Sequence, residues 1–408
     1  MNVIIRPGPL AGELQAIPSK SQAHRLLICA ALGDRPTVLA CGALNRDIEA
    51  TAACLRALGA GIEYGGGEFR ITPITVPTSG AVLDCGESGS TLRFLLPVAC
   101  ALGAEGRFLL RGRLPERPLS PLWEELERHG AVLSRPARDA VAFSGRLEPG
   151  NYSLPGDISS QYISGLLFAL PLLEGKSTLT PTGRLESAGY LALTRQAQAL
   201  FGLSWSGERA GEIWQPVSGC GYRSPGRADV EGDWSCAAFW LAADALSSGE
   251  IRITGLDPES AQGDRAAAEL IPRIRKGGAV IDAGNIPDLV PPLAAVAAAS
   301  PGESRFVNAG RLRLKESDRL QSVCAMLKSL GAEAEEKPEE LIIRGEQTLR
   351  GGVVDSFRDH RIAMSAAVAA LACREPVTIL GAEAVEKSYP AFWQDYHRLG
   401  GRIREEEA

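Results

Sequence analysis

The sequence lacks the features of several common classes of enzyme and metal-binding protein. Its nine cysteines include no Cys-x-x-Cys pair and no Cys/His cluster at metal-ligand spacing, which argues against a structural zinc site. Its four histidines form no Ser/His/Asp or Cys/His arrangement typical of nucleophilic catalysis. Scattered cysteines of this kind indicate free thiols in a reducing compartment.

Long apolar runs and an excess of positive charge are also missing. The longest apolar stretches, such as Leu289–Ala299, are too short to span a bilayer, and the first ten residues lack the apolar segment of a secretory signal. The net charge is −6, which disfavours a nucleic-acid partner. We therefore expect a cytoplasmic protein that acts on small molecules, with no membrane partner.

Six segments of the chain begin alike, which indicates a repeated structural unit. In each, a polar turn with Ser, Gly, Asp or Asn precedes a helix of small apolar residues, because such side chains can accept a hydrogen bond from an N–H at a helix start. A second, amphipathic helix follows, ends at glycine and leads into a short strand. The openings start at Ile17, Cys85, Leu154, Val230, Asn285 and Ser356.

This alternation of strands and helices predicts an α/β fold. A chain of 408 residues is too long for one ordinary core, so we expect two domains with three units each. The apolar helices should be buried and the amphipathic ones half-exposed. A linker is expected at Gly219–Arg227, which contains three glycines and a proline. A repeat could also serve only as a binding scaffold, but the residues at its helix openings argue against that alternative.

Basic and hydroxyl side chains gather at several of these openings. A helix N-terminus favours anions, and a cation placed there destabilises the helix by up to about 1 kcal/mol unless an anion offsets it. Several such positions in an acidic protein predict a polyanion site. The residues are Lys20, Ser21, Arg25, Gly89, Ser90, Arg93, Ser159, Ser160, Gln161, His360 and Arg361.

Two further segments are dense in charge. In residues 111–122 (RGRLPERPLSPL), Pro118 stiffens the loop beside Arg117, which suits a two-point contact with carboxylate or phosphate. In residues 311–320 (RLRLKESDRL), helical spacing would place Lys315 and Arg319 on one face with Glu316 beside them. The alternative for the second segment is an ordinary salt-bridged helix.

Asp288 and Glu316 are the candidates for acid–base chemistry. Asp288 has no charged neighbour in sequence and precedes a very apolar helix, so burial would raise its pKa and suit it to act as a base. The alternative is a simple helix cap. Ser88, in GESGS, matches the outline of a nucleophile elbow, but a Gly/Ser turn followed by Arg93 fits an anion cradle better.

Nine motifs, in order over almost the whole chain, resemble the 5-enolpyruvylshikimate-3-phosphate synthase family. They read PSKSQAHR, GESGSTLR, RPLSPL, GDISSQ, GDWS, IPD, KESDR, DHR and, around Lys387, EKSYPAFW. The resemblance implies two similar domains, each of three βαβαββ units around buried helices, described as an inside-out α/β barrel. It places residues 1–18 and 227–408 in one domain and 19–226 in the other, with the active site in the interdomain cleft.

The resemblance implies transfer of the enolpyruvyl group of phosphoenolpyruvate to the 5-hydroxyl of shikimate 3-phosphate, with release of phosphate, in the pathway to chorismate and aromatic amino acids. It implies a monomer that needs no cofactor or metal. The residues that would hold shikimate 3-phosphate are Lys20, Ser21, Arg25, Ser159, Ser160, Gln161, Ser187, Tyr190, Asp288 and Lys315. Those that would hold phosphoenolpyruvate are Lys20, Gly89, Arg117, Gln161, Arg319, His360, Arg361 and Lys387.

By the same resemblance, three residues are catalytic: Lys20, Asp288 and Glu316. Asp288 would be the base near the 5-hydroxyl, and Glu316 would handle the proton at the enolpyruvyl methylene. Two positions depart from the family pattern. Glu87 stands where relatives often carry an amide, which puts a negative charge near the expected phosphoenolpyruvate site, and Arg311 stands where some relatives carry asparagine.

Two alternatives share this repeat. The sister enzyme that transfers enolpyruvyl to UDP-N-acetylglucosamine usually opens with a Lys-Asn pair and carries a loop cysteine between glycines. This chain has Ser19-Lys20-Ser21 and no cysteine that fits that loop. An RNA-end-processing relative or a non-catalytic scaffold is more distant, and the acidic net charge and the Asp288/Glu316 pair count against both.

Overall fold

The computed structural model is a mixed α/β protein in which residues 1–217, 221–346 and 348–406 are described. The chain forms two compact units: unit 1 comprises Met1–Ile17 with Gly232–Ala408, and unit 2 comprises Pro18–Glu231. None of the helices in the described ranges is long and apolar enough to cross a membrane.

The boundary between the units lies later than the expected position between residues 226 and 227. Strand β14 (Arg227–Asp229) pairs in parallel with β3 (Thr37–Ala40), which makes it part of unit 2. Within the segment expected as a linker, Tyr222 is buried and Ser224 hydrogen-bonds Thr37 across 2.7 Å, so this part of it packs on unit 2. The linker's first residues, Gly219 and Cys220, lie outside the described residues.

Unit 2 alternates strands with helices from its start to its end. Its helices are α1 (Lys20–Ala31), α2 (Arg46–Ala57), α3 (Gly89–Ala101), α4 (Leu122–Arg128), α5 (Ser160–Ala169) and α6 (Ala188–Leu200), with short 3-10 turns η1 (Leu114–Glu116) and η2 (Leu170–Leu172). Its other strands are β4 (Gly61–Gly65), β5 (Glu68–Thr72), β6 (Ala81–Asp84), β7 (Gly106–Leu109), β8 (Ala131–Ala137), β9 (Ala140–Gly145), β10 (Asn151–Pro155), β11 (Thr178–Thr182), β12 (Trp205–Ser206) and β13 (Gln215–Pro216).

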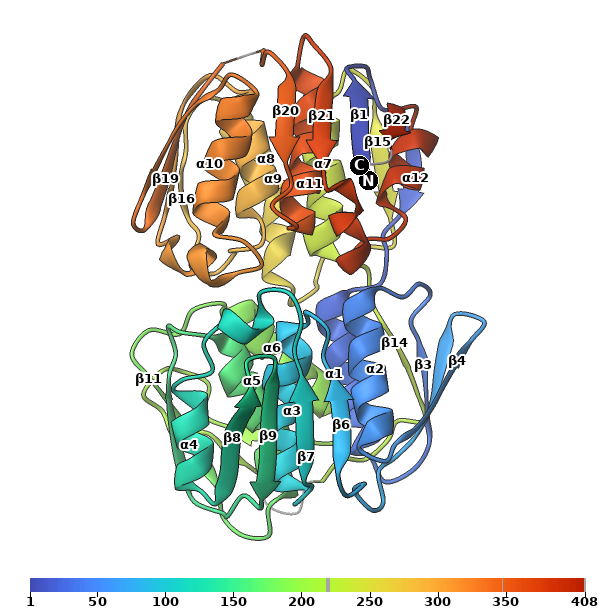
Figure 1. Ribbon diagram of the computed structural model, residues 1–408, viewed down its shortest axis with the longest axis vertical. Coiled ribbons are helices and arrows are strands. Elements are labelled where there is room, and N and C mark those ends of the chain that lie inside the picture. The colour runs from blue at the N-terminus through green and yellow to red at the C-terminus, as the bar shows by residue number, and fades with distance from the viewer. Residues whose placement is uncertain (218–220, 347, 407–408) are drawn as a thin grey trace. The chain divides into compact units, whose positions relative to one another are not determined.

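The strands of unit 2 form small sheets that cover buried helices. The sheet orders are β14-β3-β5-β4, β6-β7-β9-β8, β10-β11 and β12-β13. In the second sheet, β6 and β7 are parallel on either side of α3 in sequence, and β8 and β9 form an antiparallel hairpin after α4. Figure 1 shows this sheet with α3 behind it.

Unit 1 contains both ends of the chain. Its helices are α7 (Trp234–Leu246), α8 (Ala267–Arg275), α9 (Val290–Ala298), α10 (Arg319–Ser329), α11 (His360–Ala369) and α12 (Phe392–Arg398), with 3-10 turns η3 (Gly263–Ala266), η4 (Gly310–Leu314), η5 (Ala370–Ala372) and η6 (Ala382–Lys387). Its strands are β1 (Asn2–Arg6), β2 (Gly12–Gln15), β15 (Ile251–Thr254), β16 (Val280–Asp282), β17 (Gly302–Val307), β18 (Glu333–Lys337), β19 (Glu340–Gly345), β20 (Gly352–Asp355), β21 (Val377–Leu380) and β22 (Arg402–Glu406).

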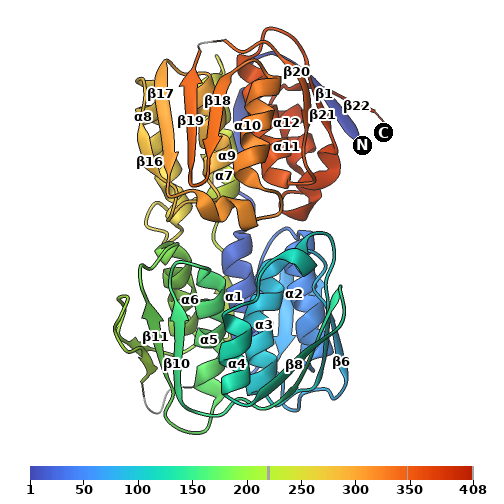
Figure 2. The same ribbon diagram turned by 60° about the vertical axis from the view of Figure 1, so that its left-hand side comes forward.

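Strands from distant parts of the sequence meet in unit 1. The sheet orders are β16-β17-β19-β18, β20-β21-β1-β22 and β15-β2. Figure 2 shows the first of these sheets beside α9 and α10. Strand β1 is antiparallel to both β21 and β22, so the first residues of the chain complete a sheet made by the last ones.

The predicted helix caps are confirmed at five of the six openings. Side-chain oxygens accept a backbone N–H at the start of α1, α3, α5, α7 and α11; the capping residues are Ser19, Ser88, Ser159, Asp233 and Asp359. The opening at Asn285 differs. Helix α9 begins at Val290 with no side-chain cap and with prolines in its first turn, so Asp288 is not a cap.

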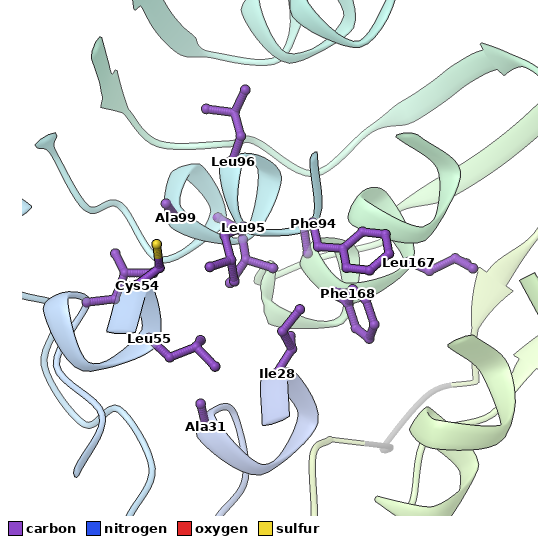
Figure 3. Packing of buried hydrophobic residues seen from close by; sticks show 14 of the residues in the cluster. Ile28, Ala31, Cys54, Leu55, Phe94, Leu95, Leu96, Ala99, Leu167 and Phe168 are labelled. Carbon is purple, nitrogen blue, oxygen red and sulfur yellow. The ribbon is translucent and has the colours of Figure 1, made fainter. Parts of the chain in front are cut away.

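The apolar first helices are buried, as predicted. In unit 2 the core lies where α1, α2, α3 and α5 meet, and Figure 3 shows Ile28, Leu55, Leu95 and Phe168 facing one another there. In unit 1 it surrounds α7, α9 and α11, and Trp240 stacks on Phe392 with ring centroids 4.9 Å apart. Buried helices of this kind bring their N-termini, with the polar residues found there, to the ends of each core.

Truncating this core should destabilise the protein. Leu95→Ala removes a fully buried side chain from α3 and should lower the free energy of unfolding by about 2–5 kcal/mol. Val132→Ala on β8, where valine is 62% exposed, is the control and should cost less than about 1 kcal/mol. Urea unfolding followed by circular dichroism measures both; equal losses would contradict the assignment of Leu95 to the core.

Candidate active site

The predicted site residues fall into two groups, one in each unit. The unit 2 group comprises Lys20, Ser21, Arg25, Gly89, Ser90, Arg93, Arg117, Ser159, Ser160, Gln161, Ser187 and Tyr190. The unit 1 group comprises Asp288, Lys315, Glu316, Arg319, His360, Arg361 and Lys387. Within each group, hydrogen bonds, ion pairs and close packing connect most of the members.

Lys20 is the first residue of α1 and is held by a carboxylate. Its Nζ lies 3.0 Å from Oδ2 of Asp47, which is in the first turn of α2. The Lys20 side chain remains 18% exposed, so it is fixed in direction while it can still contact a ligand. Asp47 therefore joins the candidate group of unit 2 through its contact with Lys20, although nothing in its local sequence pointed to it.

Arg25, one turn further along α1, is held by neutral oxygens. Its guanidinium donates to Thr194 Oγ1 (2.8 Å), to the Ser21 carbonyl (2.6 Å) and to the Tyr190 carbonyl (2.9 Å). It also lies 5.0 Å from the centre of the Phe94 ring. Burial lowers the pKa of Arg25 to about 10, so it stays charged at neutral pH. These contacts join α1 to α6, where Tyr190 is found.

Gly89, at the start of α3, lies directly against two arginines. A Cβ atom at this position would be 2.8 Å from Nη1 of Arg117 and 2.9 Å from Nη1 of Arg93, closer than real Cβ contacts. Arg93 donates to Gln161 Oε1 (2.7 Å), and Gln161 Nε2 donates to Ser90 Oγ (2.9 Å). The missing side chain of glycine thus lets two guanidinium groups pack over the N-terminus of α3.

The other members of the unit 2 group lie at the starts of α5 and α6. Ser159 Oγ accepts the Gln161 N–H at 3.3 Å, and Ser160 is the first residue of α5. Ser187 precedes α6 with φ of 57°, a left-handed conformation that is uncommon for a residue with a side chain and is found often at functional sites.

Glu87 is exposed, and its carboxylate packs against Gly112 in the loop that carries Arg117. A Cβ atom at Gly112 would overlap that carboxylate, and Gly112 has φ of 55°. In the same loop, Arg111 pairs with Asp84, at 2.5 Å, and Arg113 lies 3.8 Å from Glu116. The carboxylates of Asp84 and Glu116 thus lie beside Arg111 and Arg113. The Arg117 guanidinium of the same loop lies against Gly89.

Arg319 is the centre of the unit 1 group. Its guanidinium is 1% exposed and contacts three carboxylates: Asp288 at 2.7 Å, Glu316 at 2.7 Å and Asp359 at 2.8 Å. Its pKa is raised above the ordinary value because the charges of these carboxylates outweigh its burial. A guanidinium is planar and has five N–H donors, so it can donate hydrogen bonds to three carboxylates at once.

Asp288 is surrounded by cations, contrary to the expectation of a raised pKa. Its carboxylate lies 2.7 Å from Arg319, 3.1 Å from Arg361 and 3.7 Å from Lys315. Burial alone would raise the pKa of Asp288, but Arg361, Lys315 and Arg319 together hold it well below its ordinary value. Asp288 is therefore ionised throughout the neutral range, which is the form a base requires.

The remaining members surround the same carboxylates. Burial lowers the pKa of Lys315 to about 8, although Asp288 opposes that shift. Lys387 Nζ lies 3.4 Å from Glu316, and Nδ1 of the buried His360 lies 3.7 Å from Asp359. The predicted acid–base pair and its basic neighbours thus form one connected charge cluster.

The prediction that Lys315 and Arg319 share one helical face is wrong. Lys315 has an extended conformation after η4, and α10 begins only at Arg319, because Asp318 caps it by accepting the Gln321 N–H. The two residues come together through Asp288 instead, which both of them contact.

Asp359 was missed as a functional residue. It caps α11, accepts hydrogen bonds from Ser317 Oγ (3.0 Å) and Arg319, and is fully buried. The sequence signal was present, since Asp359 opens the DHR motif, but a capping aspartate before a helix is too common to single out.

No group of three or more His, Cys, Asp or Glu side chains in the described ranges is arranged to hold a metal ion. The chemistry that these residues can offer is anion binding by arginine, lysine and helix N-termini, and proton transfer by Asp288 and Glu316.

Comparisons with known proteins agree on one family. A model of EPSP synthase (3-phosphoshikimate 1-carboxyvinyltransferase) matches residues 4–396. Relatives called 3-phosphoshikimate 1-carboxyvinyltransferase include one from Clostridium kluyveri, 40% identical over 421 residues that cover 99% of this chain and 98% of the relative. Another, from Clostridium acetobutylicum, is 39% identical over 430 residues and 99% of each chain.

The fold resembles solved structures as well. An EPSP synthase structure from Acinetobacter baumannii superposes with a TM-score of 0.81 at 24% sequence identity, covering 99% of this chain and 100% of that one. At this identity the likeness concerns the fold, and it agrees with the mixed α/β architecture described above.

Removing the central guanidinium should destabilise unit 1. Arg319→Met leaves three buried or half-buried carboxylates without their shared cation and should cost about 3–5 kcal/mol of unfolding free energy. Arg344→Met is the matched control: that arginine pairs with Glu303 and Glu333 but is half-exposed, so its loss should cost less than about 1 kcal/mol. Urea unfolding tests this, and similar values for the two variants would contradict the central role of Arg319.

Proposed function

The chain belongs to the EPSP synthase (3-phosphoshikimate 1-carboxyvinyltransferase) family, and we propose that the two groups of residues described above carry out the family's reaction. The enzyme is a transferase of the shikimate pathway: it moves the enolpyruvyl group of phosphoenolpyruvate to the 5-hydroxyl of shikimate 3-phosphate and releases phosphate. The observation that supports the residue assignment most directly is the convergence of Lys315, Arg319 and Arg361 on Asp288.

Each substrate carries one phosphate and one carboxylate, so the enzyme must bind several negative charges close together. In a site of low dielectric this requires matching cations and N–H donors. We assign shikimate 3-phosphate to Lys20, Ser21, Arg25, Ser159, Ser160, Gln161, Ser187, Tyr190, Asp288 and Lys315. We assign phosphoenolpyruvate to Lys20, Gly89, Arg117, Gln161, Arg319, His360, Arg361 and Lys387.

The reaction is an addition followed by an elimination, and it needs a base and an acid. The 5-hydroxyl attacks C2 of phosphoenolpyruvate while C3 is protonated, which gives a tetrahedral ketal that then expels phosphate. In our proposal Asp288 accepts the hydroxyl proton and Glu316 handles the proton at C3. Lys20, fixed by Asp47, is the third catalytic residue and stabilises negative charge on the phosphoenolpyruvate.

The low pKa of Asp288 is compatible with this role. Three cations hold the pKa down, and the anionic groups of bound substrates would oppose those cations. A nearby negative charge raises the pKa of a carboxylate, so substrate binding would move Asp288 toward the range in which it is an effective base. In this proposal the cations that bind the substrates also set the pKa of Asp288.

We also propose the finer architecture and setting that the family implies. Unit 1 and unit 2 would each consist of three βαβαββ repeats around their buried helices, as in an inside-out α/β barrel. In unit 2, the segment β6-α3-β7-α4-β8-β9 has the order of one such repeat. The enzyme would act as a cytoplasmic monomer without nucleic-acid partners; the free thiols of the described cysteines suit a reducing compartment.

One assay tests the function and the role of Asp288 together. The wild-type chain should release phosphate from phosphoenolpyruvate with shikimate 3-phosphate as acceptor and not with UDP-N-acetylglucosamine. Asp288→Asn, which keeps the shape but cannot accept the proton, should lower kcat by roughly 10²–10⁴. Asp282→Asn, on β16 of the same unit, should keep wild-type kcat. No release with the first acceptor would disprove the function, and an unchanged kcat in Asp288→Asn would disprove the base.

The pKa of Lys315, about 8, predicts a pH dependence of binding. Above this pH the amine loses its proton and with it the attraction to an anion, so the KM for shikimate 3-phosphate should rise, by up to about tenfold per pH unit. Lys315→Arg stays charged and should lack this rise, whereas Lys328→Arg on the exposed face of α10 should behave like the wild type. KM measured from pH 7 to 10 decides this; identical profiles for all three proteins would exclude Lys315 as the titrating group.

A further inference from the structure

A chain of hydrogen bonds runs through the interior of unit 2 from α1 to the start of α3. His24 Nδ1 lies 2.7 Å from Thr51 Oγ1 on α2, and Thr51 Oγ1 lies 2.6 Å from Thr91 Oγ1 on α3. Thr91 Oγ1 in turn donates to Ser88 Oγ at 2.7 Å. All four side chains are at most 1% exposed. Most polar groups buried this deeply in proteins are hydrogen-bonded, and removing one member of the chain would leave its neighbour without a partner.

The positions of the protons follow from the end of this chain. Ser88 Oγ accepts both the backbone N–H and the hydroxyl of Thr91. Because a hydroxyl has one hydrogen, the Thr91 oxygen must accept from Thr51, and the Thr51 oxygen must accept from His24. His24 is therefore the tautomer with hydrogen on Nδ1 and a bare Nε2.

The surroundings of the ring agree with a neutral histidine. Among the residues that the structure describes, none hydrogen-bonds Nε2 of His24, which is buried. Burial lowers the pKa of His24 to about 3; Asp47 opposes the shift, and Lys20 and Arg25 add to it. A proton on Nε2 would leave a buried charge without an acceptor, so the direction of the hydrogen-bond chain is fixed across the neutral range.

Two pairs of side chains connect α1 to α2 with the same spacing along each helix. Lys20 and His24 are four residues apart on α1, and their partners Asp47 and Thr51 are four residues apart on α2. The outer pair is ionic and mostly buried, and the inner pair is neutral, fully buried and continues to α3. Sliding or rotating either helix would break both pairs at once.

We propose that His24, Thr51 and Thr91 are positioning residues that fix α1 relative to the N-terminus of α3 for the transfer reaction. The inference rests on the proposed function, in which Lys20, Ser21 and Arg25 on α1 hold shikimate 3-phosphate and Gly89 on α3 contacts phosphoenolpyruvate. The hydrogen-bond chain sets the distance between these helices, and through it the approach of the two reacting groups. Misplacement by about 1 Å can cost roughly 10²-fold in rate.

Isosteric variants separate this role from general stability. Thr51→Val and Thr91→Val keep the volume and remove the central hydroxyls, and His24→Asn keeps a side-chain N–H donor near the position of Nδ1. The matched control is Thr37→Val, which breaks the buried Thr37–Ser224 hydroxyl pair elsewhere in unit 2. All are assayed at a temperature well below the melting temperature of every variant.

In Thr51→Val and Thr91→Val we expect kcat to fall at least tenfold while the dissociation constant of shikimate 3-phosphate changes less than threefold. His24→Asn should recover most of the rate lost in His24→Leu, and Thr37→Val should lower the melting temperature with wild-type kcat. Wild-type kcat in Thr51→Val, or a loss of kcat in Thr37→Val that matches it, would overturn the proposal.

A spectroscopic readout tests the chain of hydrogen bonds independently of turnover. The protein has four histidines, so comparison with His24→Asn assigns the ring signals of His24 in a ¹⁵N-histidine-labelled sample. We expect the Nδ1–H tautomer from pH 8 to 5 in the wild type and its loss in Thr51→Val. An Nε2–H tautomer in the wild type would refute the direction of the chain. If the wild type released no phosphate, the proposed function would fail while this spectrum still decided the structural claim.

Discussion

The positive charge of Arg319, almost completely removed from water, is the constraint on which the unit 1 group depends. A buried guanidinium is tolerated only where acceptors surround it, and here Asp288, Glu316 and Asp359 provide them. Those acids come from three places: the turn before α9, the turn before α10 and the cap of α11. By holding all three, Arg319 sets the positions of the proposed base and the proposed acid relative to each other.

Arg25 of unit 2 is held differently. Its guanidinium donates to a hydroxyl and two carbonyls, which orient it without neutralising its charge. In unit 1 the arginines are balanced by carboxylates that also take part in the proposed chemistry. Unit 2 therefore combines an arginine held by neutral groups with Lys20, which a carboxylate holds, whereas Arg319 and Arg361 of unit 1 both lie against carboxylates.

The sequence predicted those features that depend on interactions between residues close together in the chain. The caps Ser19, Ser88, Ser159, Asp233 and Asp359 could be predicted because capping involves a side chain and an N–H two or three residues away. The α/β class and the burial of the apolar helices followed from periodicity. The family motifs added the grouping of site residues, which spacing alone could not provide.

The failures concern contacts between segments far apart in sequence. Asp288 was expected to have a raised pKa because its sequence neighbours are apolar, yet Arg319 and Arg361 reach it from 31 and 73 positions away. Lys315 was placed on a helix because its spacing to Arg319 allowed one, but the cap at Asp318 starts the helix later. Asp47 gave no signal, because its significance depends on Lys20 lying opposite it across two helices.

The pairing of β1 with β21 and β22 has a consequence for synthesis on the ribosome. Unit 2 is a continuous stretch of chain, so all of its contacts are available once Glu231 has left the exit tunnel. Strand β1 is made before unit 2 but cannot pair with β21 and β22 until residues 377–406 have followed it. The apolar side chains of Val3 and Ile5, fully buried in the folded chain, therefore remain without their sheet partners until β21 and β22 have been made.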